Sequence, residues 1–246
     1  MAPDRSETPG RRGNHPLRYV IVNADDLGLS AGVTRGILEA YEHGVVTSAS
    51  LLVDRAASAA AAEAVAAMPG LSVGLHADLA DADGRPLVDL ADTPACRAEV
   101  ERQVERFSQL VGRPPTHLDS HRNVHRLPSV RQAFRQVAGE HGLPLREDAL
   151  PAYVSTFYGQ WDGCTHPEQV SVEGLARILA GLPAGWSEVG CHPGYVDGDL
   201  RSSYRLEREL ELATLVNPRI REVAATLDIT FVGFAELLTG SGRGGS

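Results

Sequence analysis

Two adjacent carboxylates, Asp25 and Asp26, follow an apolar run at 19–22. The run is rich in β-branched residues and predicts a buried strand, so the two acids stand at its carboxyl end. Neighbouring strand residues point to opposite sides, which lets one carboxylate bind a cation while the other transfers a proton. The alternative is that the pair caps the helix that follows the strand.

Further polar residues come at or just after the ends of other predicted strands. They are His76, Asp119, His121, Arg146 and His192. In a (β/α) barrel the carboxyl ends of the strands share one face, and active sites form there. Each residue alone has an ordinary explanation as a hydrogen-bonded loop residue. Together with the aspartate pair they predict one shared site.

The residue types indicate metal-assisted hydrolysis of an amide or ester. One carboxylate with two or three imidazoles suits Zn²⁺ or another first-row divalent ion. Such an ion lowers the pKa of bound water and polarises a carbonyl group. A second carboxylate can take the proton of the water, and a second imidazole can protonate the leaving group. The aspartate pair supplies the spare acid, and His192 is the spare imidazole.

Other hydrolytic designs have less support. The chain contains neither Gly-x-Ser-x-Gly nor His-Glu-x-x-His. Cys191 beside His192 raises the alternative of a thiol nucleophile, although a cysteine at a strand end is more often a small core residue. Asp25 with Asp119 is a candidate pair for a glycosidase, but the imidazoles would then have no role.

Alternating strands and helices must position these residues. Helices are expected at 31–44, 56–68, 96–111, 127–142, 172–182 and 203–227, and further strands at 47–53, 71–75, 116–119, 143–146, 186–191 and 229–232. The fold class is therefore α/β, as a single-domain, TIM-like (β/α) barrel of about seven parallel strands over 16–240. Ser30 is the expected cap of the first helix. No Gly-rich nucleotide-binding motif follows any strand.

Two segments carry further expectations. The irregular stretch at 150–170 contains Tyr153, Tyr158 and Trp161, which are expected either to stack on sugar faces or to form a dimer contact. The charged stretch at 205–211 is expected to be a solvated helix face.

Composition limits the class of protein. The 246 residues carry a formal net charge of −9, which argues against nucleic acid or an anionic membrane as the main partner. Three widely spaced cysteines form no zinc or disulfide pattern, so a cytoplasmic location is expected. No apolar run is long enough to span a bilayer. Residues 1–15 are expected to be a disordered leader and residues 241–246 a flexible tail.

Several motifs together resemble the YdjC-like carbohydrate deacetylases, whose best-known members remove an acetyl group from N-acetylglucosamine units of chito-oligosaccharides. The matching segments are Val-Asn-Ala-Asp-Asp-Leu-Gly-Leu-Ser at 22–30, Gly-Val-Val-Thr-Ser at 44–48, Gly-Leu-His at 74–76, Gly-Arg-Pro-Pro-Thr-His-Leu-Asp-Ser-His at 112–121, Phe-Tyr-Gly at 157–159 and Cys-His-Pro at 191–193. The resemblance runs over nearly the whole chain. It implies a (β/α) barrel, a divalent metal ion and hydrolysis of an N-acetyl group.

The resemblance also implies roles for single residues. Asp26, His76 and His121 would hold one divalent ion, whether Zn²⁺, Mg²⁺, Mn²⁺ or Co²⁺. Asp25 would be the general base, His192 the general acid and Arg146 the arginine that orients the base.

The remaining family positions concern the substrate. Asp119 and His125 would line the pocket, in contact with substrate or orienting ligands, and Tyr158 would bind the sugar. Arg122 and Asn123 stand where the family usually has two histidines. The Arg122 guanidinium at the rim would favour an anionic or oxygen-rich group.

The sequence therefore predicts a metal-dependent N-deacetylase that acts on an acetamido sugar, with a homodimer as a further expectation. Two alternatives stay open. One is another metal hydrolase on the same barrel, such as a phosphoesterase. The other is a sugar-binding barrel that has lost turnover.

Overall fold

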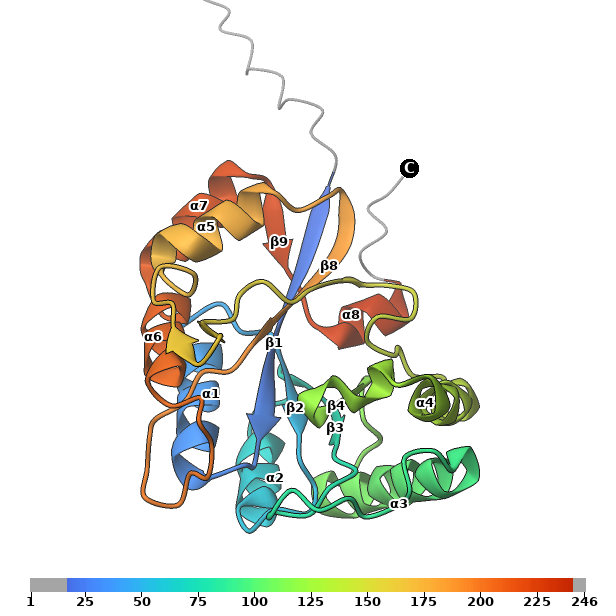
Figure 1. Ribbon diagram of the computed structural model, residues 1–246. Helices are drawn as coiled ribbons and strands as arrows, with labels where there is room; N and C mark the ends of the chain where they lie inside the picture. The colour runs from blue at the N-terminus through green and yellow to red at the C-terminus, as the bar shows by residue number, and fades with distance from the viewer. Residues whose placement is uncertain (1–16, 241–246) are drawn as a thin grey trace, which may run out of the picture.

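The computed structural model describes residues 17–240, and the predicted leader and tail lie outside the described residues. Strand β1 (Arg18–Leu27) runs through the centre of the molecule (Figure 1). It pairs in parallel with β8 (Gly185–Cys191) along one edge. Its other edge pairs with β9 (Ile229–Phe231) near the start and with β2 (Ser48–Leu51) near the end.

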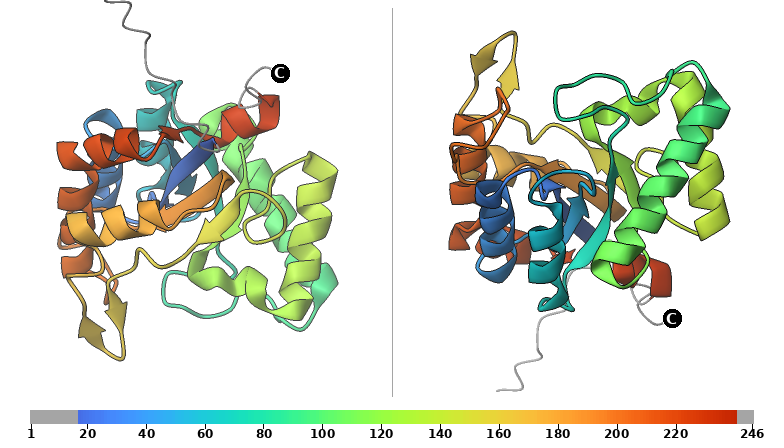
Figure 2. Two further views of the ribbon diagram at one scale, coloured as in Figure 1. Left: turned by 90° about the horizontal axis from the view of Figure 1, so that it is seen from above. Right: turned by 90° about the horizontal axis from the view of Figure 1, so that it is seen from below.

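The sheet has seven strands, and the pairings among them are parallel. Its order is β4-β3-β2-β1-β8-β5, with β9 beside β1. The remaining strands are β3 (Ser72–Ala77), β4 (Leu118–Ser120) and β5 (Ala152–Val154). The sheet curls into a half-barrel, and helices surround it when it is viewed along β1 (Figure 2). The strand number and parallel pairing agree with the prediction.

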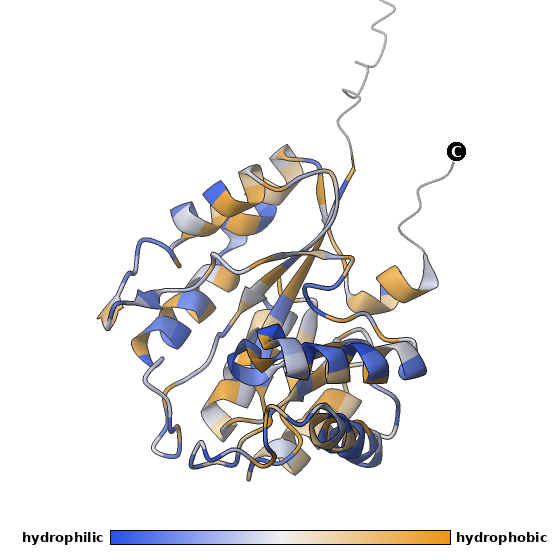
Figure 3. Cartoon of the chain, turned by 45° about the vertical axis from the view of Figure 1, so that its right-hand side comes forward, coloured by the Kyte–Doolittle hydropathy of each residue, from blue (hydrophilic) through white to orange (hydrophobic). Residues whose placement is uncertain are grey.

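Helices follow the strands and cover the outer face of the sheet. They are α1 (Ala31–Glu42), α2 (Ser58–Ala66), α3 (Thr93–Val111), α4 (Pro128–His141), α5 (Val172–Ala180), α6 (Leu206–Leu215) and α7 (Pro218–Thr226). The last helix, α8 (Phe234–Thr239), instead packs through Phe234 against Ile21 on the inner side. The hydrophilic residues of the helices lie mainly outward (Figure 3). Ser30 caps α1 as predicted, because its side chain accepts the backbone N–H of Val33 at 3.2 Å. Within residues 17–240, no helix combines the length and apolar character needed to cross a bilayer.

Alternation along β1 separates two environments. Val20, Val22 and Ala24 belong to the large hydrophobic core that includes residues of the covering helices. Ile21 instead joins a small apolar cluster with Phe234 of α8. Because successive strand residues face opposite sides, the odd-numbered residues of β1 line the inside of the curl.

The inside of the curl is apolar at the amino end and polar towards the site. Phe234 stacks on the His117 ring, with centroids 3.9 Å apart. His117 fits because Gly74 has no side chain: a Cβ there would lie 2.4 Å from the imidazole. Above this level Ser50 Oγ lies 3.1 Å from His117 Nε2 and donates to Asp119 Oδ2 at 2.6 Å. Hydrogen bonds therefore replace the branched apolar layers that usually fill such a space.

Two segments differ from the sequence prediction. The expected strand at 143–146 is reduced to one parallel bridge, between Leu145 and Leu118, because the chain leaves the edge of β4 directly afterwards. The stretch at 150–170 contains β5 and a small hairpin of β6 (Gln160–Trp161) and β7 (Cys164–Thr165). The hairpin projects from the body of the protein (Figure 2).

Candidate active site

The two aspartates lie within β1, at an irregularity in its pairing with β2. The register shifts between Ala24 and Leu27, and Asp26 has a φ of 71°. Left-handed backbone is uncommon outside glycine, but aspartate tolerates it better than most residues. Bulges of this kind re-aim side chains, and here the irregularity gives the neighbouring acids separate surroundings. The capping alternative is wrong, since Ser30 caps the following helix.

Asp25 is held by an arginine from the far end of the sheet. Arg146 Nη1 donates to Asp25 Oδ2 at 2.7 Å, and Nη2 donates to Oδ1 at 2.8 Å. Asn23 Nδ2 also donates to Oδ1, at 2.8 Å. Burial acts to raise the pKa of Asp25, but Arg146 and His76 together hold the pKa below its ordinary value. The carboxylate is therefore ionised and fixed in orientation.

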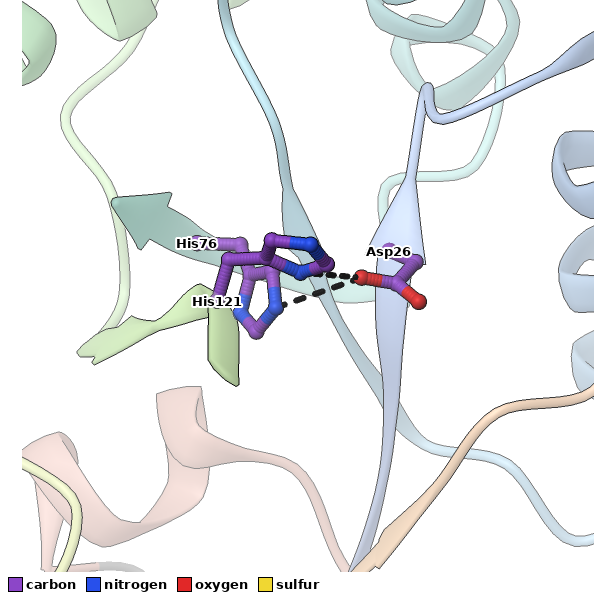
Figure 4. Close-up of side chains that lie close together, drawn as sticks. All are labelled: Asp26, His76 and His121. Atoms are coloured by element: carbon purple, nitrogen blue, oxygen red, sulfur yellow. Dashed lines mark hydrogen bonds and ion pairs between the residues drawn. The ribbon is translucent and has the colours of Figure 1, made fainter. Parts of the chain in front are cut away.

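Asp26 faces two imidazoles, as Figure 4 shows. Asp26 Oδ1 lies 3.0 Å from His121 Nδ1 and 3.4 Å from His76 Nε2. The other oxygen, Oδ2, accepts from Arg208 Nη2 at 2.6 Å. Burial opposes ionisation, but Arg208 and His121 hold the pKa of Asp26 well below its ordinary value.

These three residues fit a divalent metal ion. Asp26, His76 and His121 each offer one ligand atom, and these atoms lie within 4.8 Å of one another. Ligands about 2.1 Å from one ion are roughly 3.0–3.4 Å apart in octahedral or tetrahedral geometry, and the two separations from Asp26 Oδ1 fall in this range. A mixed set of one carboxylate and two imidazoles suits Zn²⁺ and related ions.

A second carboxylate orients one of the imidazoles. Asp119 Oδ1 lies 2.7 Å from His76 Nδ1, which leaves Nε2 of the same ring towards Asp26. Carboxylate partners of this kind fix the tautomer of metal-binding histidines. Asp119 Oδ2 also lies 2.8 Å from Arg146 Nη2. Asp25, His76 and Asp119 form a second group with possible ligand atoms, but Arg146 already binds both of its carboxylates.

His192 follows β8 and faces Asp25. Its Nε2 lies 3.8 Å from Asp25 Oδ2. Burial lowers the pKa of His192 to about 4 although Asp25 and Asp26 act in the other direction, so the ring is neutral at pH 7. The rings of Tyr158 and Tyr204 lie edge-on to it, with centroids 5.7 and 5.6 Å away.

A cavity of about 560 Å³ opens over these groups. Of the predicted site residues, its lining includes Asp25, Asp26, His76, His121, Arg122, Tyr158 and His192. Tyr153 lines it as well, whereas Trp161 is outside the lining and stacks on His166.

Two predicted pocket residues lie behind the cavity wall. Asp119 and His125 are fully buried and are not part of the lining. His125 Nδ1 lies 2.6 Å from Ser120 Oγ, and its Nε2 lies 3.1 Å from Glu147 Oε2. Both side chains make their contacts with protein groups behind the cavity, so direct contact with substrate stays a prediction. Orientation of a ligand is the role that the geometry of Asp119 supports.

A family model described as YdjC-like protein matches residues 19–226. The chain belongs to this family. A carbohydrate deacetylase of Geobacillus stearothermophilus is 39% identical, covering 89% of this chain and 98% of the relative. A chitooligosaccharide deacetylase of Serratia marcescens is 32% identical, covering 89% and 99%.

A solved structure shows the same fold. It is a protein of Enterococcus faecalis V583 provisionally named for cellobiose-phosphate cleavage, with a TM-score of 0.78 and 24% identity. The match covers 90% of this chain and 99% of that one. The family resemblance predicted from the motifs is therefore confirmed.

In this YdjC-like chain, α6 contributes residues that sequence reasoning missed. The stretch at 205–211 was expected to be a solvated face, but Glu207, Arg208 and Glu211 are buried. Arg208 reaches Asp26, and Glu211 Oε2 accepts the backbone N–H of His192 at 2.5 Å. The acidic and basic pattern of an exposed helix looks the same in sequence, so only the packing of α6 against the site identifies these roles.

The remaining chemical alternatives do not fit the geometry. Cys191 is buried and donates to the carbonyl of Asn23 at 3.3 Å, and burial holds the pKa of its thiol well above the ordinary value. It is therefore unsuited to be a nucleophile. Asp25 and Asp119 both bind Nη2 of Arg146, so they do not flank an open space as a glycosidase pair does.

Glu188 is a further residue that the sequence did not indicate. It is fully buried on β8, and its Oε1 accepts from Arg146 Nε at 2.8 Å and from Nη2 at 2.6 Å. Its Oε2 has no hydrogen-bond partner among residues 17–240. Arg146 thus faces three carboxylates, Asp25, Asp119 and Glu188. Burial raises the pKa of Glu188 to about 7 against the effect of Arg146.

This pKa makes a prediction for Glu188→Gln in the metal-free protein. Between pH 4.5 and 7 the folded state holds a proton on Glu188 that the unfolded state has lost, so the wild type loses stability as pH rises. Glutamine does not titrate, so the variant does not lose stability in this way. We expect its free energy of unfolding, relative to wild type, to increase by up to roughly 3 kcal/mol from pH 5 to pH 8. Urea denaturation at four pH values measures the difference, and a flat or falling difference contradicts the assignment.

Proposed function

We propose that this protein is a metal-dependent N-deacetylase of carbohydrates that hydrolyses the acetamido group of a sugar to acetate and a free amine. The observation that carries the proposal is the separation of the aspartate pair. Asp25 is bound by Arg146 beside His192, and Asp26 converges with two imidazoles. The names of the family relatives support this activity.

The residues divide the reaction between them. Asp25 accepts a proton from the attacking water while the water oxygen bonds to the acetyl carbon. The bond between carbon and nitrogen then breaks, and the amine leaves with a proton donated by His192. Since His192 is neutral at rest and 3.8 Å from Asp25, the proton taken by the base can supply the acid.

Asp26, His76 and His121 would hold the divalent ion, which polarises the acetyl carbonyl and makes water more acidic when bound. Zn²⁺, Mg²⁺, Mn²⁺ and Co²⁺ are the candidates. Asp119 keeps the His76 ring in the required tautomer.

The cavity supports a sugar substrate. Tyr158 is 38% exposed and lies stacked against Tyr204, with centroids 4.6 Å apart, which gives an aromatic face at the cavity. Arg122 lines the same cavity and has no ion-pair partner among residues 17–240.

Arg122→Gln tests the substrate role of this arginine. We expect KM for an acetamido sugar to rise about 10-fold with kcat within about twofold, because a contact made equally in ground and transition states is lost. Steady-state kinetics at several substrate concentrations separate the two constants. A fall in kcat at unchanged KM would instead place Arg122 in the chemical step.

Acetate release tests the activity itself. Purified protein loaded with each candidate metal is offered N-acetylglucosamine, its oligosaccharides and a panel of phosphate esters. Acetate from the acetamido sugars is the expected product. Phosphate release without acetate would favour the phosphoesterase alternative, and metal binding without turnover would favour a sugar-binding barrel.

The finer expectations stay predictions. They are closure of the half-barrel into a TIM-like barrel, a homodimer and a cytoplasmic location. Closure is supported by the segment at 145–154, which pairs with β4 at Leu145 and with β8 through β5.

A further inference from the structure

Arg208 contacts a proposed metal ligand, yet the proposed reaction gives it no task. It lies on α6, its side chain is 3% exposed, and it forms part of the cavity lining. Nη2 donates to Asp26 Oδ2 at 2.6 Å. Each aspartate of the pair therefore has an arginine of its own, Arg146 for Asp25 and Arg208 for Asp26.

Main-chain acceptors fix the Arg208 guanidinium. Nε donates to the carbonyl of Tyr204 at 3.0 Å, and Nη1 donates to the carbonyl of His192 at 3.4 Å. Arginine presents its donors in a rigid planar fork, so these bonds determine where Nη2 points. The donor cannot easily follow Asp26 if that carboxylate rotates.

The consequence is that the two oxygens of Asp26 are not equivalent. Oδ2 is occupied by Arg208, while Oδ1 faces His76 and His121. A carboxylate can bind a cation through one oxygen or through both. With Oδ2 engaged in a buried, charge-assisted hydrogen bond, binding through both would break an ion pair whose loss leaves a buried charge unpaired.

We propose that Arg208 is a positioning residue that restricts Asp26 to a single ligand oxygen, leaving more of the coordination sphere of a bound ion to water and substrate. Catalytic metal sites keep such open positions, whereas closed sites are structural. The inference rests on the metal site of the proposed deacetylase. In this role Arg208 weakens metal binding and increases turnover.

Titration of metal-free protein with Co²⁺ tests this without reference to turnover. In Arg208→Met the second oxygen of Asp26 becomes available. Loss of an outer partner usually weakens metal binding, but this substitution removes a nearby positive charge and frees a second ligand oxygen. We therefore expect Co²⁺ to bind about 10-fold more tightly, with a change in the visible absorption of Co²⁺ that reports an altered coordination number. Arg208→Lys keeps the positive charge but lacks the planar fork, so its Co²⁺ affinity and spectrum should lie between those of wild type and Arg208→Met. Arg219→Met removes an exposed arginine that pairs with Glu173 outside the cavity lining, and it should leave both the Co²⁺ affinity and the spectrum unchanged.

Turnover should change in the opposite direction to affinity. We expect acetate release by Arg208→Met to fall at least 10-fold at saturating metal, a combination that a general loss of structure does not produce. Weaker Co²⁺ binding, or tighter binding with an unchanged spectrum, would overturn the proposal. If Arg208→Met fails to fold by circular dichroism, Arg208→Gln carries the same expectation. Failure of the wild type to release acetate would contradict the proposed function, whereas the Co²⁺ titrations alone decide the role of Arg208.

Discussion

Asp25→Asn is expected to retain the metal and to lose turnover by about 10²- to 10⁴-fold, the usual contribution of a general base. The amide oxygen of asparagine can still accept from one Arg146 nitrogen, although its NH₂ group faces the other. The amide cannot take a proton from water. Acetate release and the metal content of the desalted protein are measured together.

A matched control distinguishes this loss from a general effect of the substitution. Asp228→Asn makes the same change at an exposed residue that also has a positive φ, of 53°, outside the cavity lining. It should behave as wild type. Persistent activity of Asp25→Asn would remove Asp25 as the base, and loss of metal from that variant would instead favour the group formed by Asp25, His76 and Asp119 as the binding site.

Asp26→Asn should fail for a different reason, through loss of the metal. Asparagine tolerates the left-handed backbone of this position, which has a φ of 71°, so the substitution isolates the charge. Loss of an outer partner of a metal ligand typically costs 10- to 100-fold in affinity, and we expect loss of the ligand charge itself to cost at least as much. Calorimetric titration with Zn²⁺ and Mn²⁺ measures the change.

Removal of the metal from the wild type should have the same outcome. Dialysis against a chelator is expected to abolish acetate release, and addition of a divalent ion should restore it. Asp26→Asn should recover only at high metal concentration, whereas added metal should not rescue Asp25→Asn. Full activity after exhaustive chelation would contradict a metal-dependent reaction.

The sequence alone determined the α/β class, the parallel sheet, the YdjC-like family and the set of residues brought together at the site. These features can be predicted because strand periodicity, helix periodicity and capping by Ser30 each depend on residues that are close in sequence. Since the strands are parallel, polar residues at their carboxyl ends must meet on one edge. The choice of Asp26, His76 and His121 as metal ligands came instead from the family resemblance, and these three residues do lie together.

The family resemblance implied different roles for the neighbouring aspartates, but only the tertiary structure decided how their surroundings differ. An irregularity in β1 gives Asp26 its left-handed backbone, and the partners of the two acids come from 121 and 182 residues along the chain. No periodicity distinguishes a buried Arg208 or Glu211 from residues of a solvated helix. Their burial depends on how α6 packs beside α1, with Arg208 directed to Asp26 and Glu211 to the His192 loop, and local sequence patterns do not encode such contacts between distant segments.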